Sequence, residues 1–157
     1  MKQHQHGFTL IELMVSVTIM LLLVGGGIAS YVSFNDRQTL VTSAHRVETY
    51  LRSAQKKARV GDRPATCTVF DGYAVRLTSG SDLIELIAQC GVANNITVQT
   101  DHLSGDVVPV SDQTIRFAGL HGGVQGAGTI NLTDGDQTYS IIVTEGGEIE
   151  DMGVQEQ

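Results

Sequence analysis

The feature that most constrains this chain is an apolar segment near its N-terminus, residues 6–34. From Phe8 to Val24 the segment contains one charged residue, Glu12. A stretch of about 20 mostly apolar residues is long enough to cross a bilayer as a helix. A charged carboxylate at the bilayer centre costs roughly 2.5–3.5 kcal/mol on insertion scales. Glu12 is therefore a candidate functional residue that needs a partner, and the alternative is a carboxylate near the membrane interface that its own helix N-terminus favours.

The residues of this segment leave two interpretations open. A secretory signal peptide would have small residues at a cleavage site after the apolar run, and "GGGIAS" offers them. A helical pattern continues at once, however, which favours a retained anchor with residues 8–34 as the transmembrane half of a longer helix. Each glycine inside a helix costs about 1 kcal/mol relative to alanine. Three successive glycines therefore predict a flexible point that bends or unwinds, at Gly25, Gly26 and Gly27.

Residues 35–62 are expected to form the second, amphipathic half of the helix. Apolar residues recur there at alternating spacings of four and three, which places them in one stripe: Leu40, Ala44, Val47, Leu51, Ala54 and Ala58. We expect this stripe to face a sheet. The opposite face carries basic residues that would then be exposed: Arg46, Arg52, Lys56 and Arg59. "GDRP" at 61–64 predicts the end of the helix.

Residues 63–157 predict a β-rich globular domain. Short runs with β-type composition alternate with Gly, Asn and Asp clusters, and the expected strands are 65–70, 73–78, 82–90, 95–100, 114–118, 128–133 and 138–144. "SGSD" and "TDGDQ" are typical of hairpin turns. The expected fold class is therefore α+β, with antiparallel sheets packed on the amphipathic half of a long N-terminal helix.

Charge is distributed unevenly along the chain. The net charge is −7, and residues 64–157 contain two basic and thirteen acidic residues. Phosphate binding draws on Lys and Arg, so an acidic domain argues against nucleic acid as its main partner.

The two cysteines, Cys67 and Cys90, both follow the apolar segment. If the chain is exported, they are favoured to form a disulfide, and two unrelated buried thiols are the alternative. We expect the bond to join two early strands of the domain.

No spaced catalytic signature is present, so the chain is not expected to be an enzyme, and no cofactor is predicted. His45, His102 and His121 are scattered, and none stands with Cys at metal-ligand spacing, so no metal site is predicted. His45 is interpreted as a packed or surface residue. "DGD" at 134–136 is interpreted as a hairpin turn rather than a calcium site.

The stretch "GFTLIELMVSVTIMLLLV", residues 7–24, resembles the N-terminal signal of type IV prepilins. The resemblance implies a leader at residues 1–7, cleavage by a prepilin peptidase between Gly7 and Phe8, and methylation of the new Phe8 amine. It also implies that Glu12 lies beside the Phe8 amine of a neighbouring subunit during assembly. The implied partners are other pilins or pseudopilins in a helical filament, the peptidase and methylase, an inner-membrane assembly platform, and membrane lipid before assembly.

A second, less specific resemblance lies in "TIRFAGLHGGVQGAGTINLTDGDQTYSIIVTEGGEIE", which is similar to the last strands of GspH/FimT-type minor pseudopilins and pilins. It implies a minor pseudopilin of a type II secretion pseudopilus. A minor type IV pilus subunit is the alternative. The implied location is the inner membrane, crossed once, with the C-terminal domain on the periplasmic or extracellular side. DNA-binding relatives end in an Arg-rich motif where this chain has Glu148 and Glu150, so DNA binding is not expected.

Overall fold

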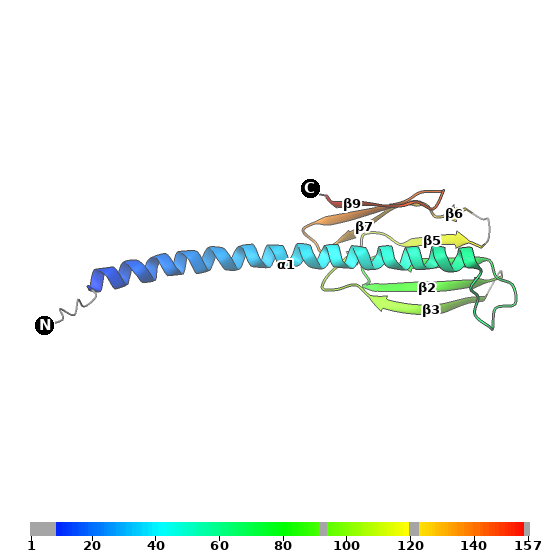
Figure 1. Cartoon of the computed structure of the whole chain (residues 1–157), viewed down its shortest axis with the longest axis horizontal. Helices are drawn as coiled ribbons and strands as arrows, with labels where there is room; N and C mark the ends of the chain where they lie inside the picture. The colour runs from blue at the N-terminus through cyan, green and yellow to red at the C-terminus, as the bar shows by residue number, and fades with distance from the viewer. Residues whose placement is uncertain (1–8, 92–93, 120–122, 156–157) are drawn as a thin grey trace, which may run out of the picture. The chain divides into compact units, whose positions relative to one another are not determined.

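The computed structural model describes residues 9–91, 94–119 and 123–155, apart from the side chains of residues 26–30 and 32–33 (Figure 1). The chain divides into two compact units, residues 1–36 and 37–157. Gly7, Phe8 and His121 lie outside the described residues.

One helix, α1 (Leu10–Val60), contributes to both units. Its backbone is helical through the three glycines at 25–27, so the structure contains no unwound turn there, and flexibility at these residues stays a prediction. The helix ends where the sequence indicated. Gly61 adopts φ 67°, its N–H donates to the carbonyl of Ala58 (3.3 Å), and the N–H of Asp62 donates to the carbonyl of Lys57 (3.1 Å). This pair of bonds is a Schellman motif, which a glycine in the left-handed region stabilises.

The second unit consists of α1 from residue 37 onward and two antiparallel sheets. One sheet has the strand order β3-β2-β1-β5-β6 and the other β4-β7-β8-β9. The strands of the first sheet are β1 (Gly72–Leu77), β2 (Leu83–Cys90), β3 (Asn94–His102), β5 (Gln113–Ala118) and β6 (Val124–Gln125). Those of the second are β4 (Val108–Pro109), β7 (Gly128–Thr133), β8 (Thr138–Val143) and β9 (Ile149–Gln155).

The predicted apolar stripe of the helix is the centre of the core. All six of its residues are at most 1% exposed. They belong to one cluster with side chains of both sheets, among them Val75, Leu86 and Ile115 of the first sheet and Ile130 and Ile141 of the second. Three stripe residues are alanines, so the helix backbone can approach the sheets closely. The structure thus confirms the α+β fold class, a pilin-like helix packed on antiparallel sheets (Figure 1).

Both predicted hairpins are confirmed. β1 pairs with β2 across 78–82, and β7 pairs with β8 across 134–137. The expected strand at 65–70 is wrong, because that segment consists of turns and bends. β1 already has β2 on one side and β5 on the other, so its neighbouring segment has no free edge of β1 to pair with.

Cys67 and Cys90 form a disulfide with Cα atoms 5.2 Å apart. Cys90 ends β2, but Cys67 lies in the loop that follows the helix. The expectation that the bond joins two strands is therefore wrong for Cys67. The bond instead fastens the helix-to-β1 loop onto the end of β2. Cys67 is 3% and Cys90 is 7% exposed, so the bridge is part of the core.

Candidate functional site

Residues 10–24 of α1 present a largely apolar helix surface on all sides. Every residue from Leu10 to Val24 is exposed, with large aliphatic side chains between 47% (Val17) and 78% (Leu10) exposed. A helix that is apolar all round is normally buried, in a membrane or among other helices. An exposed apolar surface of this extent marks an interaction site for lipid or protein.

The polar hydroxyls of this surface are satisfied by the helix itself. Ser16 donates to the carbonyl of Glu12 (2.7 Å), and Thr18 donates to the carbonyl of Met14 (2.8 Å). These bonds let Ser and Thr lie in an apolar helix without a partner molecule.

Glu12 lies in the first turn of α1, and Thr9 caps that turn. The N–H of Glu12 donates to Thr9 Oγ1 at 3.3 Å, which is one half of a capping box of the Thr-x-x-Glu type. A carboxylate at this end of a helix also gains about 0.3–1 kcal/mol from the partial positive charge of the helix N-terminus. The sequence motif "TLIE" therefore has a local role in starting the helix.

The basic face of the helix in the second unit is partly occupied within the chain. Arg46 Nη1 donates to the carbonyl of His102 (2.8 Å) and to Asp101 Oδ1 (3.3 Å), which ties the helix to the end of β3. Arg52 donates through Nε and Nη2 to Glu48 Oε1 at 2.9 and 2.6 Å. Arg52, Lys56 and Arg59 are exposed as expected, whereas Arg46 is only partly exposed, so the expectation is wrong for Arg46 alone.

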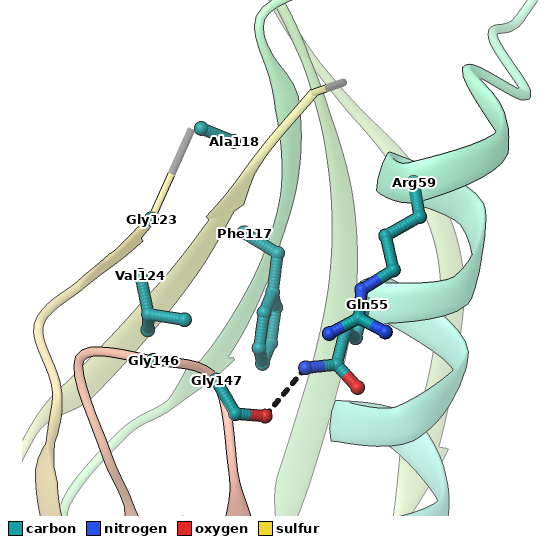
Figure 2. A pocket seen from close by; sticks show the side chains of 8 residues that line it. All are labelled: Gln55, Arg59, Phe117, Ala118, Gly123, Val124, Gly146 and Gly147. Carbon is teal, nitrogen blue, oxygen red and sulfur yellow. Dashed lines mark hydrogen bonds between the residues drawn. The ribbon is translucent and has the colours of Figure 1, made fainter. Parts of the chain in front are cut away.

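A small pocket of about 50 Å³ lies between the helix, the end of β5 and the β8–β9 turn (Figure 2). The side-chain amide of Gln55 donates to the carbonyl of Gly147 at its edge, and Phe117 forms a wall. This volume suits a few water molecules. A larger hollow of about 290 Å³ lies near β5, where the guanidinium of Arg116 donates to the side chain of Gln89. Neither pocket brings together a nucleophile and a base.

The structure also assembles a cluster that the sequence did not indicate. His45 and Glu48 of α1 and Asp151 of β9 place potential ligand atoms within 4.8 Å of one another. The spacing of His45 and Glu48, one helical turn apart, was the available signal. Asp151 is too far away in the sequence for any local pattern to include it.

The phenol of Tyr139, which lies beside this cluster, has a raised pKa. Burial, the hydrogen bond to Asp151, and the negative charges of Asp151 and Glu48 all raise the pKa of Tyr139 above its ordinary value. Elsewhere, the hydrogen bond from Lys57 to Asp62 (2.9 Å) raises the pKa of Lys57.

Within the described residues, no helix proved long and apolar enough to cross a membrane.

Residues 2–28 match a family model described as the prokaryotic N-terminal methylation motif. Comparisons with curated proteins and with solved structures gave no significant match. The matched residues contain the stretch on which the resemblance to prepilins rests, and the GspH/FimT subtype is not supported by a relative. The comparisons therefore show that residues 2–28 carry the N-terminal methylation motif of type IV pilin-like proteins.

Proposed function

We propose that the chain is a minor pseudopilin, a structural subunit of a type II secretion pseudopilus. A minor type IV pilus subunit is the alternative. One observation carries the proposal. Residues 10–24 of the helix, which are exposed and mostly apolar and include Glu12 in the first turn, lie within a matched methylation motif. Such a surface is suited to packing among identical or similar helices rather than to binding a small molecule.

A comparison of two free energies favours a partner for Glu12. The helix N-terminus contributes about 0.3–1 kcal/mol, less than the roughly 2.5–3.5 kcal/mol that a charged residue costs when it is buried as deeply as the bilayer centre. Cleavage after Gly7 would create a Phe8 amine that stays cationic after methylation. An ion pair between Glu12 and the Phe8 amine of a neighbouring subunit would offset the remaining cost and fix the register between helices.

We also propose the steps by which the chain would reach a filament. Residues 8–34 would hold the chain in the inner membrane until a prepilin peptidase processes it and the assembly platform adds it to a filament. The domain after residue 34 would face the periplasm or the exterior. The Cys67–Cys90 disulfide supports this, because such bonds persist in oxidising compartments.

Intact-mass analysis of the protein extracted from membranes tests the processing step. We expect a mature chain that starts at Phe8 and carries one added methyl group. In a host without the peptidase, the mass should correspond to the full chain. A mature chain starting near Ser30 would instead identify an ordinary signal peptide and contradict the proposal.

Deleting the gene in its host and restoring it from a plasmid distinguishes the two candidate functions, pseudopilin and pilus subunit. A pseudopilin should be required for the release of type II substrates, with surface pili intact. A pilus subunit should be required for pili, with secretion intact. Unchanged secretion and unchanged pili would contradict both.

A further inference from the structure

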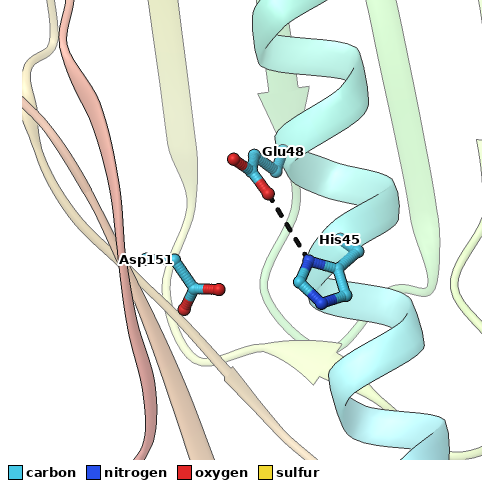
Figure 3. Close-up of side chains that lie close together, drawn as sticks. All are labelled: His45, Glu48 and Asp151. Atoms are coloured by element: carbon cyan, nitrogen blue, oxygen red, sulfur yellow. Dashed lines mark hydrogen bonds and ion pairs between the residues drawn. The ribbon is translucent and has the colours of Figure 1, made fainter.

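We propose that His45, Glu48 and Asp151 form a binding site for a divalent transition-metal ion of the zinc type, which would link α1 to β9. The inference concerns the globular domain and does not depend on the proposed filament role. Figure 3 shows the three side chains gathered between the helix and the strand.

The distances between the potential ligand atoms suit tetrahedral coordination of an ion. His45 Nδ1 and Glu48 Oε2 are 3.4 Å apart. In a tetrahedral zinc site with bonds of about 2.0–2.1 Å, neighbouring ligand atoms are about 3.4 Å apart. The two helix residues therefore already have ligand spacing. The ligand atom of Asp151 is within 4.8 Å of both, so a small side-chain movement would complete three ligands and leave one position for water.

A bulge in β9 helps to position Asp151. Ser140 of β8 pairs with Gly153, and its neighbour Ile141 pairs with Asp151, so Met152 is the extra residue. Bulges of this kind redirect side chains and are frequent beside functional sites. Asp151 follows Ile149 by two residues, and residues at this spacing lie on the same face of a strand. Because Ile149 belongs to the core cluster, this is the face that the helix covers.

Neighbouring donors hold both carboxylates in place. Asp151 accepts from the Tyr139 hydroxyl at Oδ2 (2.5 Å) and from the N–H of Gly153 at Oδ1 (2.8 Å). Glu48 accepts from Arg52 at Oε1, while Oε2 faces His45. Hydrogen bonds to ligating carboxylates are typical of metal sites, because they orient the ligands. The Tyr139 ring also meets the His45 ring edge-on, with centroids 6.5 Å apart.

The donor set selects the class of ion. An imidazole nitrogen with two carboxylate oxygens matches the mixed nitrogen and oxygen sites of zinc. Calcium and magnesium prefer oxygen ligands alone, and the thiolates that softer ions favour are absent from this cluster. Arg52 adds a positive charge beside Glu48, so the site should bind more weakly than one without that cation.

The proposed ion would support an edge strand. Among the strands of the described residues, β9 has one neighbour, β8, in the order β4-β7-β8-β9. A metal bridge would add a second attachment, from Asp151 to the helix. Binding to the folded state alone would raise the thermal stability of the domain.

The test is calorimetric titration of Zn²⁺ into the full chain in detergent, after removal of metals with EDTA. The leader residues His4 and His6 are replaced by Ala, because they could bind zinc themselves. We expect one Zn²⁺ per chain and an increase in the melting temperature. His45→Ala and Asp151→Asn should each weaken binding at least tenfold and abolish the increase in melting temperature.

His102→Ala is the matched control, since His102 is also exposed and also pairs with a carboxylate, Asp82 (2.8 Å). It should bind Zn²⁺ as the parent does. Circular dichroism in EDTA checks that each variant is folded. Asp151→Asn removes a charge but keeps the shape, so it remains informative if His45→Ala fails to fold. Absence of Zn²⁺ binding, unchanged affinity in both cluster variants, or an equal response to Ca²⁺ or Mg²⁺ would overturn the proposal.

Discussion

The two halves of the long helix differ in how far their apolar residues are exposed. In residues 37–60, a narrow stripe is buried against two sheets, and Leu51 is 0% exposed. In residues 10–24, apolar residues surround the helix, and Leu21 is 69% exposed. The same residue type therefore has two environments within one helix.

This difference indicates that the apolar residues of the two halves have different partners. The stripe finds its partners inside the chain, so the domain can fold by itself around its own core. The first half lacks such a pattern, because its apolar residues cover every side. Its partners must be lipid or other chains, which accords with the methylation motif matched there.

Removal of residues 1–36 should have the largest effect on assembly and little effect on the domain. We expect a chain of residues 37–157, exported with a cleavable signal, to fold as a monomer with its disulfide formed. It should be absent from filaments. Sedimentation and thiol titration check the first expectation, and filament purification checks the second. A domain that unfolds without the first unit would remove the distinction between the halves.

Replacing one leucine in each half tests the contrast on matched residues. Leu51→Ala should destabilise the domain by about 2–5 kcal/mol, because it opens a cavity in a packed core. Leu21→Ala should change the unfolding free energy by less than about 0.5 kcal/mol. Urea unfolding of both full-length variants in the same detergent measures the two effects. Equal losses would show that the first half is part of the domain core.

The disulfide should stabilise only the second unit. Removing it with Cys67→Ala and Cys90→Ala together should cost about 3 kcal/mol, by the loop-entropy estimate for a sequence separation of 23. Reductant should lower the urea midpoint of the wild type to that of the double variant and leave the double variant unchanged. A wild type insensitive to reductant would mean that the bond contributes little.

The smallest expected effects distinguish Arg46, which is ion-paired within the chain, from Lys56 and Arg59. Arg46→Ala should cost about 0.2–1 kcal/mol of domain stability, because Arg46 is ion-paired with Asp101 at 3.3 Å and both side chains are partly exposed. Lys56→Glu with Arg59→Glu should leave stability unchanged, since both residues are exposed, and weaken incorporation into filaments. Normal incorporation would identify this surface as merely solvated.

Local sequence rules predicted much of the fold. The alternating spacings of four and three identified the buried stripe, Gly61 identified the helix end, and "SGSD" and "TDGDQ" identified hairpins. Each of these features depends on residues close together in the chain. The disulfide was predicted from the presence of two cysteines in one domain, on the hypothesis that this domain is exported.

The features that sequence reasoning missed depend on distant pairing. Residues 65–70 alternate like a strand, but both edges of β1 belong to other strands. β4 and β6 contain two residues each, too few for a periodic signal. Arg46 and Asp151 find their contacts only after β3 and β9 are placed beside the helix.

The central claim is that Glu12 acts between subunits through its charge. The most direct test measures how much of a Glu12→Gln variant enters purified filaments, relative to the amount in the membrane. Glutamine fits the N3 position of a capping box as glutamate does, so the helix start is preserved while the charge is lost. Ser16→Ala, one turn later, is the control. We predict that Glu12→Gln stays in the membrane and is excluded from filaments, whereas Ser16→Ala is incorporated normally. Normal incorporation of Glu12→Gln would contradict the ion pair and leave Glu12 only its local role at the start of the helix.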